Sequence, residues 1–290
     1  MGDWGAESPL LKNNWVTLMK ELTVGEFEKI RKYIKDNFGI SLSDEKKTLV
    51  HSRLRTTLDE LGFNSFTQYF DYLISDKTGE AIKRFVEKIT TNHTFFMRES
   101  DHFDYFRENV LPYIEAEYSN QRDMRMWCAA CSSGEESVTL QIICHDYFKK
   151  TGQNWNSELL ATDISTKVLD KAVGGQYPTE ALANMPVEWR TNYFTKVDNQ
   201  FSKVADEIRK NITYRKFNLM DNFPFKKKFQ VIFCRNVMIY FDTHTRDSVV
   251  RKFFEVTEPG GYLFIGHSES ISNSNTGYQY IKPAVYRKPK

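Results

Sequence analysis

The apolar positions of this chain follow two different patterns. Between residue 24 and about residue 89, apolar side chains recur every three or four positions, which is the spacing of amphipathic helices. After residue 124, short apolar runs of strand length alternate with longer helical stretches, which is typical of an α/β sheet. The pattern therefore predicts a small helical domain followed by an α/β domain.

The second predicted helix of the helical part carries several basic residues. It begins near Ser43, because acids follow in the first turn, and it ends at Gly62, since glycine commonly terminates helices. Basic side chains border its apolar stripe, namely Lys46, His51, Arg53 and Arg55. A solvated helix face is the ordinary explanation of such residues, and a surface that receives an acidic partner is the alternative.

The stretch MRMWCAACSSGEE, residues 124–136, organises the second half of the chain. A short apolar run gives way to small residues, one glycine and two acids, and residues 137–150 then have a helical pattern. Strand, tight turn and helix in this order form the first unit of an open nucleotide-binding sheet. The next apolar run, residues 158–162, ends at Asp163, where an acid would hold a ribose diol.

The turn in this stretch excludes two common classes of ligand site. It lacks the GxGxxG pattern and no Lys-Ser/Thr pair follows it, which argues against a dinucleotide dehydrogenase and against a phosphate-binding loop. A turn with acids suits a ligand that has an amino group and no phosphates. S-adenosylmethionine fits that description.

The last third of the chain completes the predicted sheet. Residues 229–234 form a fully buried strand, and Arg235 and Asn236 follow at its carboxyl end, where ligands of such sheets bind. Residues 262–266 and 278–288 are expected to form a closing antiparallel hairpin. An ending of this kind is usual for class I methyltransferases.

Composition and charge narrow the class of protein. The chain has 290 residues with 40 basic and 38 acidic side chains, so nothing in its charge points to nucleic acid or a membrane surface. Its apolar runs are far shorter than the ~20 residues of a membrane span, and residues 1–20 lack the basic-then-apolar pattern of a secretion signal. We therefore expect a cytoplasmic protein that binds no nucleic acid and does not insert into membranes.

The four cysteines lie in apolar stretches and are expected to be buried and reduced. Cys128 and Cys131 form a CxxC pair, but a structural zinc site would need a second such pair or histidines at a matching spacing. The sequence has neither, and no metal site is predicted.

Motifs along the whole chain resemble those of the bacterial chemotaxis receptor methyltransferases, the CheR family. They occur in the family's order and cover nearly all of residues 24–288. The motifs are TTNHTFFMRE (90–99), AACSSGEES (129–137), ATDIS (161–165), FNLMD (217–221), FCRNVMIYF (233–241) and PGGYLFIGHSES (259–270). The first motif and CRNVMIYF are far more specific than a lone glycine loop.

The resemblance implies an α/β fold in which a small N-terminal helical domain precedes a class I, Rossmann-like methyltransferase domain with a small antiparallel β insertion. The expected bounds are a loosely ordered arm at 1–22, the helical domain at 23–89, a linker at 90–100, the methyltransferase domain at 101–290 and the insertion at about 193–216. It also implies a function: S-adenosylmethionine would methylate glutamate side chains on the cytoplasmic helices of chemoreceptors, giving the methyl ester and S-adenosylhomocysteine. Such an enzyme serves sensory adaptation, and we expect a monomer.

The resemblance also assigns site residues. Arg98 and Tyr240 are the catalytic candidates, placed near the transferred methyl group and the substrate carboxylate. No general base is expected, because a glutamate with a pKa of ~4.3 is already ionised at neutral pH. The basic residues of the second predicted helix are expected to contact the receptor. The cofactor-binding candidates are Asn92, Thr94, Arg98, Glu135, Glu136, Asp163, Asn218, Leu219, Arg235 and Asn236.

Glu135 and Glu136 stay open alternatives for the ammonium group of the cofactor. One of them is expected to bind it, and the other to face solvent or to cap the helix.

The expected β insertion bears on the partner. Some members of the family use a longer, glycine-containing hairpin there to grip a peptide at the end of a receptor tail. Residues 193–216 of this chain contain no glycine, and the turn after Asp198 is short. Without glycine, the backbone is harder to approach and a peptide strand is harder to add. We therefore predict an enzyme that docks on the methylation helices and does not depend on a tail peptide.

Two other functions remain as alternatives. One is a class I methyltransferase of the same build that acts on another protein or on a small molecule. The other is a signalling adaptor that binds S-adenosylmethionine without catalysis, which the presence of both Arg98 and Tyr240 disfavours. Methylation of a receptor fragment would separate these alternatives from the first function.

Overall fold

The computed structural model describes residues 21–271 and 276–290. Residues 1–20 of the expected arm lie outside the described residues. Leu22, which the prediction placed in the arm, is buried in the core of the helical domain. The helical domain therefore includes Leu22.

The N-terminal domain consists of helices, as the apolar spacing predicts. A capping box starts α1, in which the Thr23 hydroxyl accepts from the Glu26 amide at 3.2 Å and the Glu26 carboxylate accepts from the Thr23 amide at 3.0 Å. Gly62 ends α2 in the left-handed conformation, with φ of 74°. The elements are α1 (Val24–Phe38), η1 (Asp44–Lys46), α2 (Lys47–Leu61), α3 (Phe66–Ser75) and α4 (Glu80–Ile89).

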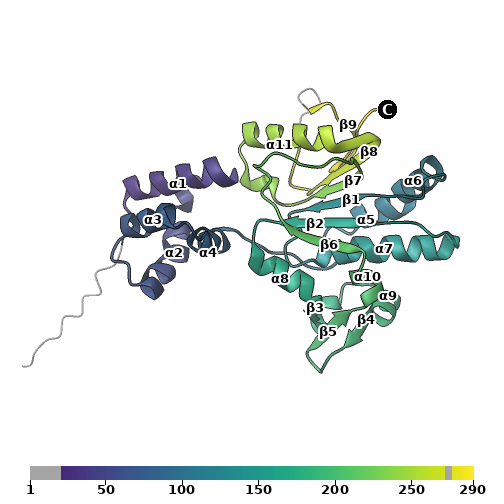
Figure 1. Ribbon diagram of the computed structural model, residues 1–290, viewed down its shortest axis with the longest axis horizontal. Coiled ribbons are helices and arrows are strands. Elements are labelled where there is room, and N and C mark those ends of the chain that lie inside the picture. Colours follow the sequence, from purple (N-terminus) through teal and green to yellow (C-terminus); the bar gives the residue numbers. More distant parts are fainter. Residues whose placement is uncertain (1–20, 272–275) are drawn as a thin grey trace, which may run out of the picture.

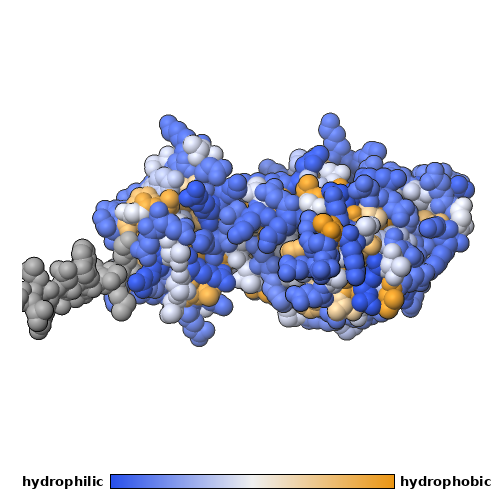
Figure 2. Space-filling model, turned by 90° about the horizontal axis from the view of Figure 1, so that it is seen from below, coloured by the Kyte–Doolittle hydropathy of each residue, from blue (hydrophilic) through white to orange (hydrophobic). Residues whose placement is uncertain are grey.

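A linker without regular structure leads from α4 to a segment with three helical turns of different type. They are α5 (Asp101–Tyr105), the π-helical η2 (Phe106–Val110) and α6 (Leu111–Glu117), which follow one another without a break. Figure 1 shows the linker as an extended segment without helix or strand between the helical domain and the larger α/β domain. In Figure 2 the two domains appear as two lobes with a mostly hydrophilic surface.

The larger domain is built on a 7-stranded sheet with the strand order β6-β2-β1-β7-β8-β10-β9. Neighbouring strands are parallel from β6 to β8, whereas β10 is antiparallel to both of its neighbours. Strands β2 and β6 lie on one side of β1, whereas β7 and β8, which come later in the chain, lie on its other side. The strand order therefore switches between β1 and β7, and ligands of such sheets bind at the carboxyl ends of the strands beside this switch point. The strands are β1 (Met126–Ala129), β2 (Leu159–Asp163), β6 (Ile212–Lys216), β7 (Phe229–Cys234), β8 (Thr257–Ile265), β9 (Gln279–Lys282) and β10 (Val285–Arg287).

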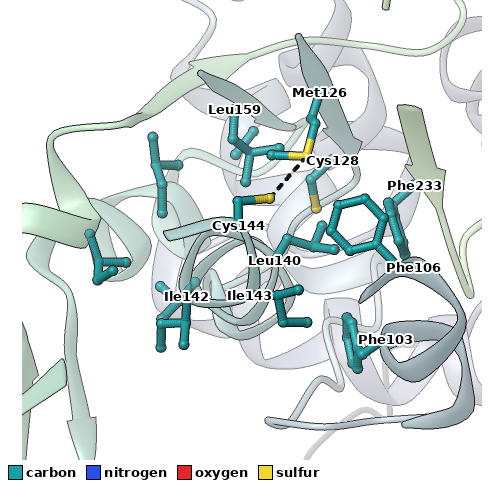
Figure 3. Close-up of a cluster of buried hydrophobic side chains, with 14 of the residues drawn as sticks. Phe103, Phe106, Met126, Cys128, Leu140, Ile142, Ile143, Cys144, Leu159 and Phe233 are labelled. Carbon is teal, nitrogen blue, oxygen red and sulfur yellow. Dashed lines mark hydrogen bonds between the residues drawn. The ribbon is translucent and has the colours of Figure 1, made fainter. Parts of the chain in front are cut away.

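Helices cover both faces of this sheet (Figure 1). On one face, Met126 and Cys128 of β1 lie in a core with α7 (Glu135–Thr151) and with the turns around Phe103 and Phe106 (Figure 3). The same core includes the buried Leu169 of α8 (Thr166–Gly174). On the other face, Trp127 packs with α11 (Thr243–Val256). The alternation along β1 explains why this strand is apolar throughout.

The β insertion differs from its expected bounds at both ends. A separate 3-stranded antiparallel sheet has the order β3-β5-β4, and it begins well before residue 193. The last expected strand, β6, pairs in parallel with β2 and belongs to the main sheet. The elements of this region are β3 (Gln176–Pro178), η3 (Thr179–Leu182), α9 (Val187–Tyr193), β4 (Phe194–Lys196), β5 (Phe201–Val204) and α10 (Asp206–Arg209).

The sequence placed residues 212–216 in the insertion, but they form β6, an edge strand of the main sheet. Buried or partly buried residues alternate with exposed ones along β6. That pattern is the same for an edge strand of a large sheet and for a strand of a small hairpin. The predicted antiparallel pairing at the end of the chain is confirmed, because β10 pairs with β8 and Val285 lies opposite Phe264. Residues 278–288, which were expected to form one strand of a hairpin, contain two strands, β9 and β10, which pair with each other.

The four cysteines are buried and free, as predicted. Among the described residues, no helix is both long and apolar enough to cross a membrane.

We expect Phe233→Ala to be one of the most destabilising substitutions in the chain. The Phe233 ring is fully buried and stacks on Phe264, with 4.2 Å between the ring centroids. Removing such a ring leaves a cavity and should lower the free energy of unfolding by about 3–5 kcal/mol, measured by urea denaturation. Val187→Ala, at a position that is 67% exposed, is the control and should change it by less than about 0.5 kcal/mol. Equal effects of the two substitutions would contradict this description of the core.

Candidate functional site

A cavity lies at the carboxyl ends of β1, β2 and β7, where the strand order reverses. Its walls come from three parts of the chain: the helical domain, the linker and the loops of the sheet. Most residues that the sequence assigned to the site line this cavity. They are Lys46, Arg53, Asn92, Thr94, Arg98, Glu136, Asp163, Asn218, Leu219, Arg235, Asn236 and Tyr240.

Three of the assigned residues lie outside the cavity lining, namely His51, Arg55 and Glu135. Glu135 turns away from the cavity, and both of its carboxylate oxygens accept from the Ser133 hydroxyl, at 2.8 and 3.0 Å. Burial raises the pKa of Glu135. Glu136, the next residue, reaches the cavity. Of the two glutamates, only Glu136 lines the cavity.

The turn after β1 is held in an unusual backbone conformation. Ala130 and Ser132 have φ of 64° and 49°, in the left-handed region that residues other than glycine rarely adopt. Gly134 has φ of 98°, and a Cβ there would meet the Tyr177 hydroxyl at 2.7 Å. Because α7 starts directly after this glycine, its first turn can approach the cavity closely.

Asp163 at the end of β2 stabilises this turn through hydrogen bonds to its backbone. Its carboxylate accepts from the backbone amides of Ser132 and Ser165, each at 2.9 Å. Burial raises the pKa of Asp163, and the backbone hydrogen bonds oppose that effect. The Ser132 hydroxyl in turn donates to the carbonyl of Asn92 in the linker, at 3.1 Å. Asp163 therefore orders the turn and also lines the cavity.

Arg235, at the end of β7, joins the sheet to the linker and to α7. Its guanidinium pairs with Glu136 at 2.6 Å and with Glu99 at 3.0 Å, and it donates to the carbonyl of Arg98 at 2.5 Å. The sequence treated Arg235 as a cofactor contact, and it gave no role to Glu99. The structure shows that most of the Arg235 donors are already occupied by the protein.

Glu99 is the second centre of this network. Its carboxylate accepts from Arg235, from the Asn236 side chain at 3.0 Å and from the His267 amide at 3.2 Å. Although burial raises the pKa of Glu99, the hydrogen bond from Asn236 and the charge of Arg235 outweigh it and lower the pKa to about 2. The sequence held one signal of this role, which is that Glu99 closes the specific linker motif.

Glu99, His102 and His267 also lie close enough together to hold a cation, because their ligand atoms all lie within 4.8 Å of one another. Two features oppose a metal there. Glu99 already accepts three hydrogen bonds, and the adjacent Arg235 guanidinium repels a dication. Burial and the charge of Arg235 lower the pKa of His102 to about 3, so this histidine is neutral at physiological pH. We assign the cluster to the Arg235 network.

Arg98 and Tyr240, the two catalytic candidates, line the same cavity. The Arg98 guanidinium donates to the carbonyl of His93 at 2.9 Å and lies 5.9 Å from the centre of the Phe95 ring. Among the described residues, no carboxylate forms an ion pair with Arg98. Its remaining donors are therefore available to an anionic group in the cavity.

The helical domain closes the cavity through contacts that the sequence did not reveal. The Ser41 amide donates to the Tyr240 carbonyl at 2.7 Å, and the Asn218 side chain donates to the Asn37 carbonyl at 2.8 Å. Lys35 forms an ion pair with Asp242 at 2.8 Å. Both hydrogen bonds involve backbone carbonyl groups, which every residue has. The sequence therefore could not predict them.

The basic residues of α2 do not form one uniform surface. Arg53 donates to the carbonyl of Ile89 at 2.7 Å and to the Thr91 hydroxyl at 3.1 Å, so it anchors the start of the linker. The His51 ring packs near Phe66, and Arg55 lies 4.0 Å from Asp59. Lys46 is exposed and lies at the cavity. The Arg53 guanidinium thus has a structural role at the linker, and the expected contacts of these four residues with the receptor stay a prediction.

Two family models together match most of the chain. The model of the CheR methyltransferase all-alpha domain matches residues 25–90, and the model of the CheR methyltransferase SAM binding domain matches residues 92–286. The chain belongs to the CheR methyltransferase family. The larger domain is thus the S-adenosylmethionine-binding domain of a CheR methyltransferase.

Curated relatives agree with this assignment over nearly their full lengths. The chain is 40% identical to a chemotaxis protein methyltransferase of Borreliella burgdorferi over 95% of this chain and 98% of that protein. It is 35% identical to a probable chemotaxis protein methyltransferase of Rhizobium etli, over 86% and 97%. It is 33% identical to the chemotaxis protein methyltransferase of Salmonella typhimurium, over 97% and 95%.

The residues of the cavity fit S-adenosylmethionine. Two carboxylates, of Glu136 and Asp163, lie at the cavity, which suits an ammonium group and a diol. The turn between β1 and α7 lacks the glycine pattern of a pyrophosphate site. The buried Nε of Arg235 has no hydrogen-bond partner among the described residues.

We expect Asp163→Asn to weaken binding of S-adenosylhomocysteine strongly. The substitution removes the charge at the end of β2 and loosens the turn that Ser132 belongs to. A loss of about 2–3 kcal/mol, or roughly 30- to 150-fold in affinity, should appear in calorimetric titration. Asp170→Asn, at an exposed position of α8, is the matched control and should bind normally. Wild-type affinity in the Asp163 variant would refute the assignment.

Proposed function

We propose that this chain transfers a methyl group from S-adenosylmethionine to the side-chain carboxylate of glutamates on the cytoplasmic helices of chemoreceptors. The products are the glutamate methyl ester and S-adenosylhomocysteine, and the reaction serves adaptation in chemotaxis. The observation that carries the proposal is a cavity in which the Arg98 guanidinium, without a carboxylate partner among the described residues, lies with Tyr240, Glu136 and Asp163. The enzyme would act as a monomer in the cytoplasm, where the methylated helices are.

The cavity residues divide into a cofactor side and a substrate side. On the cofactor side, Glu136 holds the ammonium group and Asp163 the ribose diol. Asn218 and Leu219 contact the adenine, and Asn92 and Thr94 of the linker cover the bound molecule. Arg235 and Asn236 form the far wall. Arg235 acts there mainly by holding Glu136 and Glu99 in place.

For this reaction the protein must align the glutamate carboxylate with the methyl group of the cofactor, and no general base is needed. S-adenosylmethionine supplies a carbon already activated by the sulfonium group. The glutamate nucleophile has a reference pKa of ~4.3 and is ionised at neutral pH. Arg98 orients this carboxylate with its free donors, and the Tyr240 hydroxyl lines the path to the methyl group. A substrate carboxylate that enters the cavity would lose part of its water shell, which otherwise competes for the nucleophile's lone pairs.

Tyr240→Phe and Arg98→Ala should each lose most of the turnover of a receptor fragment. The tyrosine variant removes one hydroxyl on the substrate side, so kcat should fall by about 10- to 100-fold while the affinity for S-adenosylhomocysteine stays within about two-fold. Arg98→Ala should lower both kcat and the affinity for S-adenosylhomocysteine, because the linker also covers the cofactor. The assay follows base-labile radioactivity from labelled cofactor. A wild-type protein that binds the cofactor but labels no receptor fragment would favour another methyl acceptor or a silent adaptor.

The basic edge of α2 is proposed to attract the receptor. Lys46 lies at the cavity and Arg55 lies away from it, and neither anchors the linker as Arg53 does. Exposed charges act mainly on association and are screened by salt. Lys46→Glu combined with Arg55→Glu should therefore raise KM for the receptor at low salt, with kcat and cofactor affinity unchanged. The single variant Lys77→Glu, at an exposed loop position after α3, provides the control. Equal receptor kinetics in all three proteins would leave only a solvated helix face.

Independence from a receptor tail peptide is also proposed. The small sheet offers two edges, β3 and β4, and each has only three residues. Pro178 ends β3 and cannot donate a backbone hydrogen bond to an added strand. The turn after β4 is closed by Asp198, which accepts from the amides of Gln200 and Phe201 at 2.7 Å each. Both edges are therefore poor sites for adding a peptide strand.

A receptor fragment that lacks its C-terminal tail should be methylated with the same kcat/KM as the full cytoplasmic fragment. The isolated tail peptide should show no binding in calorimetry at concentrations of about 100 μM, since a stable strand addition needs a longer free edge. Micromolar binding of the peptide that disappears when β4 and β5 are altered would contradict this proposal.

A further inference from the structure

Glu269 is a buried carboxylate with no role in the site as described so far. It lies after β8 in the motif PGGYLFIGHSES and is 7% exposed. Its oxygens accept from three backbone amides: those of Asn236 at 3.1 Å, Ile239 at 3.1 Å and Gly266 at 2.6 Å. An ionised carboxylate forms stronger hydrogen bonds than a neutral acceptor, and three donors compensate much of the cost of its burial.

Two of these donors belong to the turn that carries residues of the site. Asn236 and Tyr240 line the cavity, and the amides of Asn236 and Ile239 attach this turn to Glu269 near both of its ends. Asn236 has φ of 58°, in the left-handed region, which asparagine tolerates better than most residues with a side chain. The hydrogen bond from its amide to Glu269 stabilises the turn in this conformation.

The backbone of Gly266 supports the same turn from another side. A Cβ at this position would meet the Asn236 side chain at 2.5 Å and the Asn236 amide nitrogen at 2.9 Å. The turn therefore packs directly on a position that only glycine can occupy without a shift of the neighbours. Glu269 and Gly266 together fix the position of the backbone between the end of β7 and Tyr240.

We infer that Glu269 is a positioning residue for methyl transfer, which holds the turn from Asn236 to Tyr240 so that both side chains face the cavity. The inference rests on the proposed function. It goes beyond it because Glu269 lies outside the lining of the cavity and acts only through the backbone. A merely structural role would lower stability without any special relation to Tyr240.

The experiment compares Glu269→Gln with the wild-type protein as full chains. Glutamine has nearly the same shape, but its NH2 group faces amide donors and only one acceptor oxygen remains. We expect kcat for a receptor fragment to fall about ten-fold or more, which corresponds to roughly 1.4 kcal/mol, with KM for the fragment within about two-fold. Glu258→Gln is the matched control, because it breaks an ion pair with Arg125 at the opposite end of β8. The control should keep wild-type kcat.

A double-mutant cycle with Tyr240→Phe separates positioning from general damage. If Glu269 acts through the Tyr240 hydroxyl, Glu269→Gln should change kcat by no more than about two-fold once that hydroxyl is absent. The same loss of kcat in both backgrounds would overturn the inference. Gly266→Ala supplies a second route, since it displaces the Asn236 backbone without altering the carboxylate, and it carries the test if Glu269→Gln does not fold.

Amide hydrogen exchange judges the inference without any activity. In Glu269→Gln, exchange at Asn236 and Ile239 should become faster, whereas exchange in the central strands β1 and β7 should stay as in the wild-type protein. Unchanged exchange at both turn residues would overturn the inference, even if kcat fell. A wild-type protein that fails to methylate receptor fragments would instead refute the proposed function, and the exchange data would still decide the role of Glu269.

Discussion

A buried guanidinium connects the three segments that surround the cavity. The Arg235 side chain is 1% exposed, and it meets Glu136 of α7, Glu99 of the linker and the carbonyl of Arg98. Burying one charge in a protein costs several kcal/mol unless close partners compensate it. Here two carboxylates share one cation, so the removal of Arg235 would leave both Glu99 and Glu136 without their counter-charge. The arrangement therefore ties the position of the linker to the end of β7.

This constraint explains how a linker without regular structure can carry a catalytic candidate. Met97 and Glu99 have φ of 64° and 54°, which is unfavourable for residues with side chains. Arg235 binds the carbonyl of the residue between them and the side chain of Glu99. The backbone of Arg98 is thus an anchor, while its guanidinium is left for the cavity. Structure and chemistry use different parts of the same residue.

Much of this arrangement could be predicted from local patterns in the sequence. The helices of the N-terminal domain, the strand, turn and helix after residue 124, and Asp163 at a strand end all follow from periodicity and from the geometry of parallel sheets. The choice between Glu135 and Glu136 could not be predicted. Adjacent helical residues point about 100° apart, and which of them faces the cavity depends on Arg235, which is distant in sequence. Strand β6 was misplaced for a similar reason, because its partner β2 is chosen by the whole sheet. The role of Glu269 has no local signal, since its hydrogen bonds go to backbone amides.

The hydrogen bonds from Ser41 to Tyr240 and from Asn218 to Asn37 give the helical domain a second significance. The domain whose basic helix is proposed to attract the receptor also forms a wall of the cavity. A change in this domain would therefore alter the proposed receptor surface and the cavity wall together. A relative that exchanged its helical domain to recognise a different receptor would receive a new cavity wall with it, and compensating changes in the loops after β6 and β7 would have to follow.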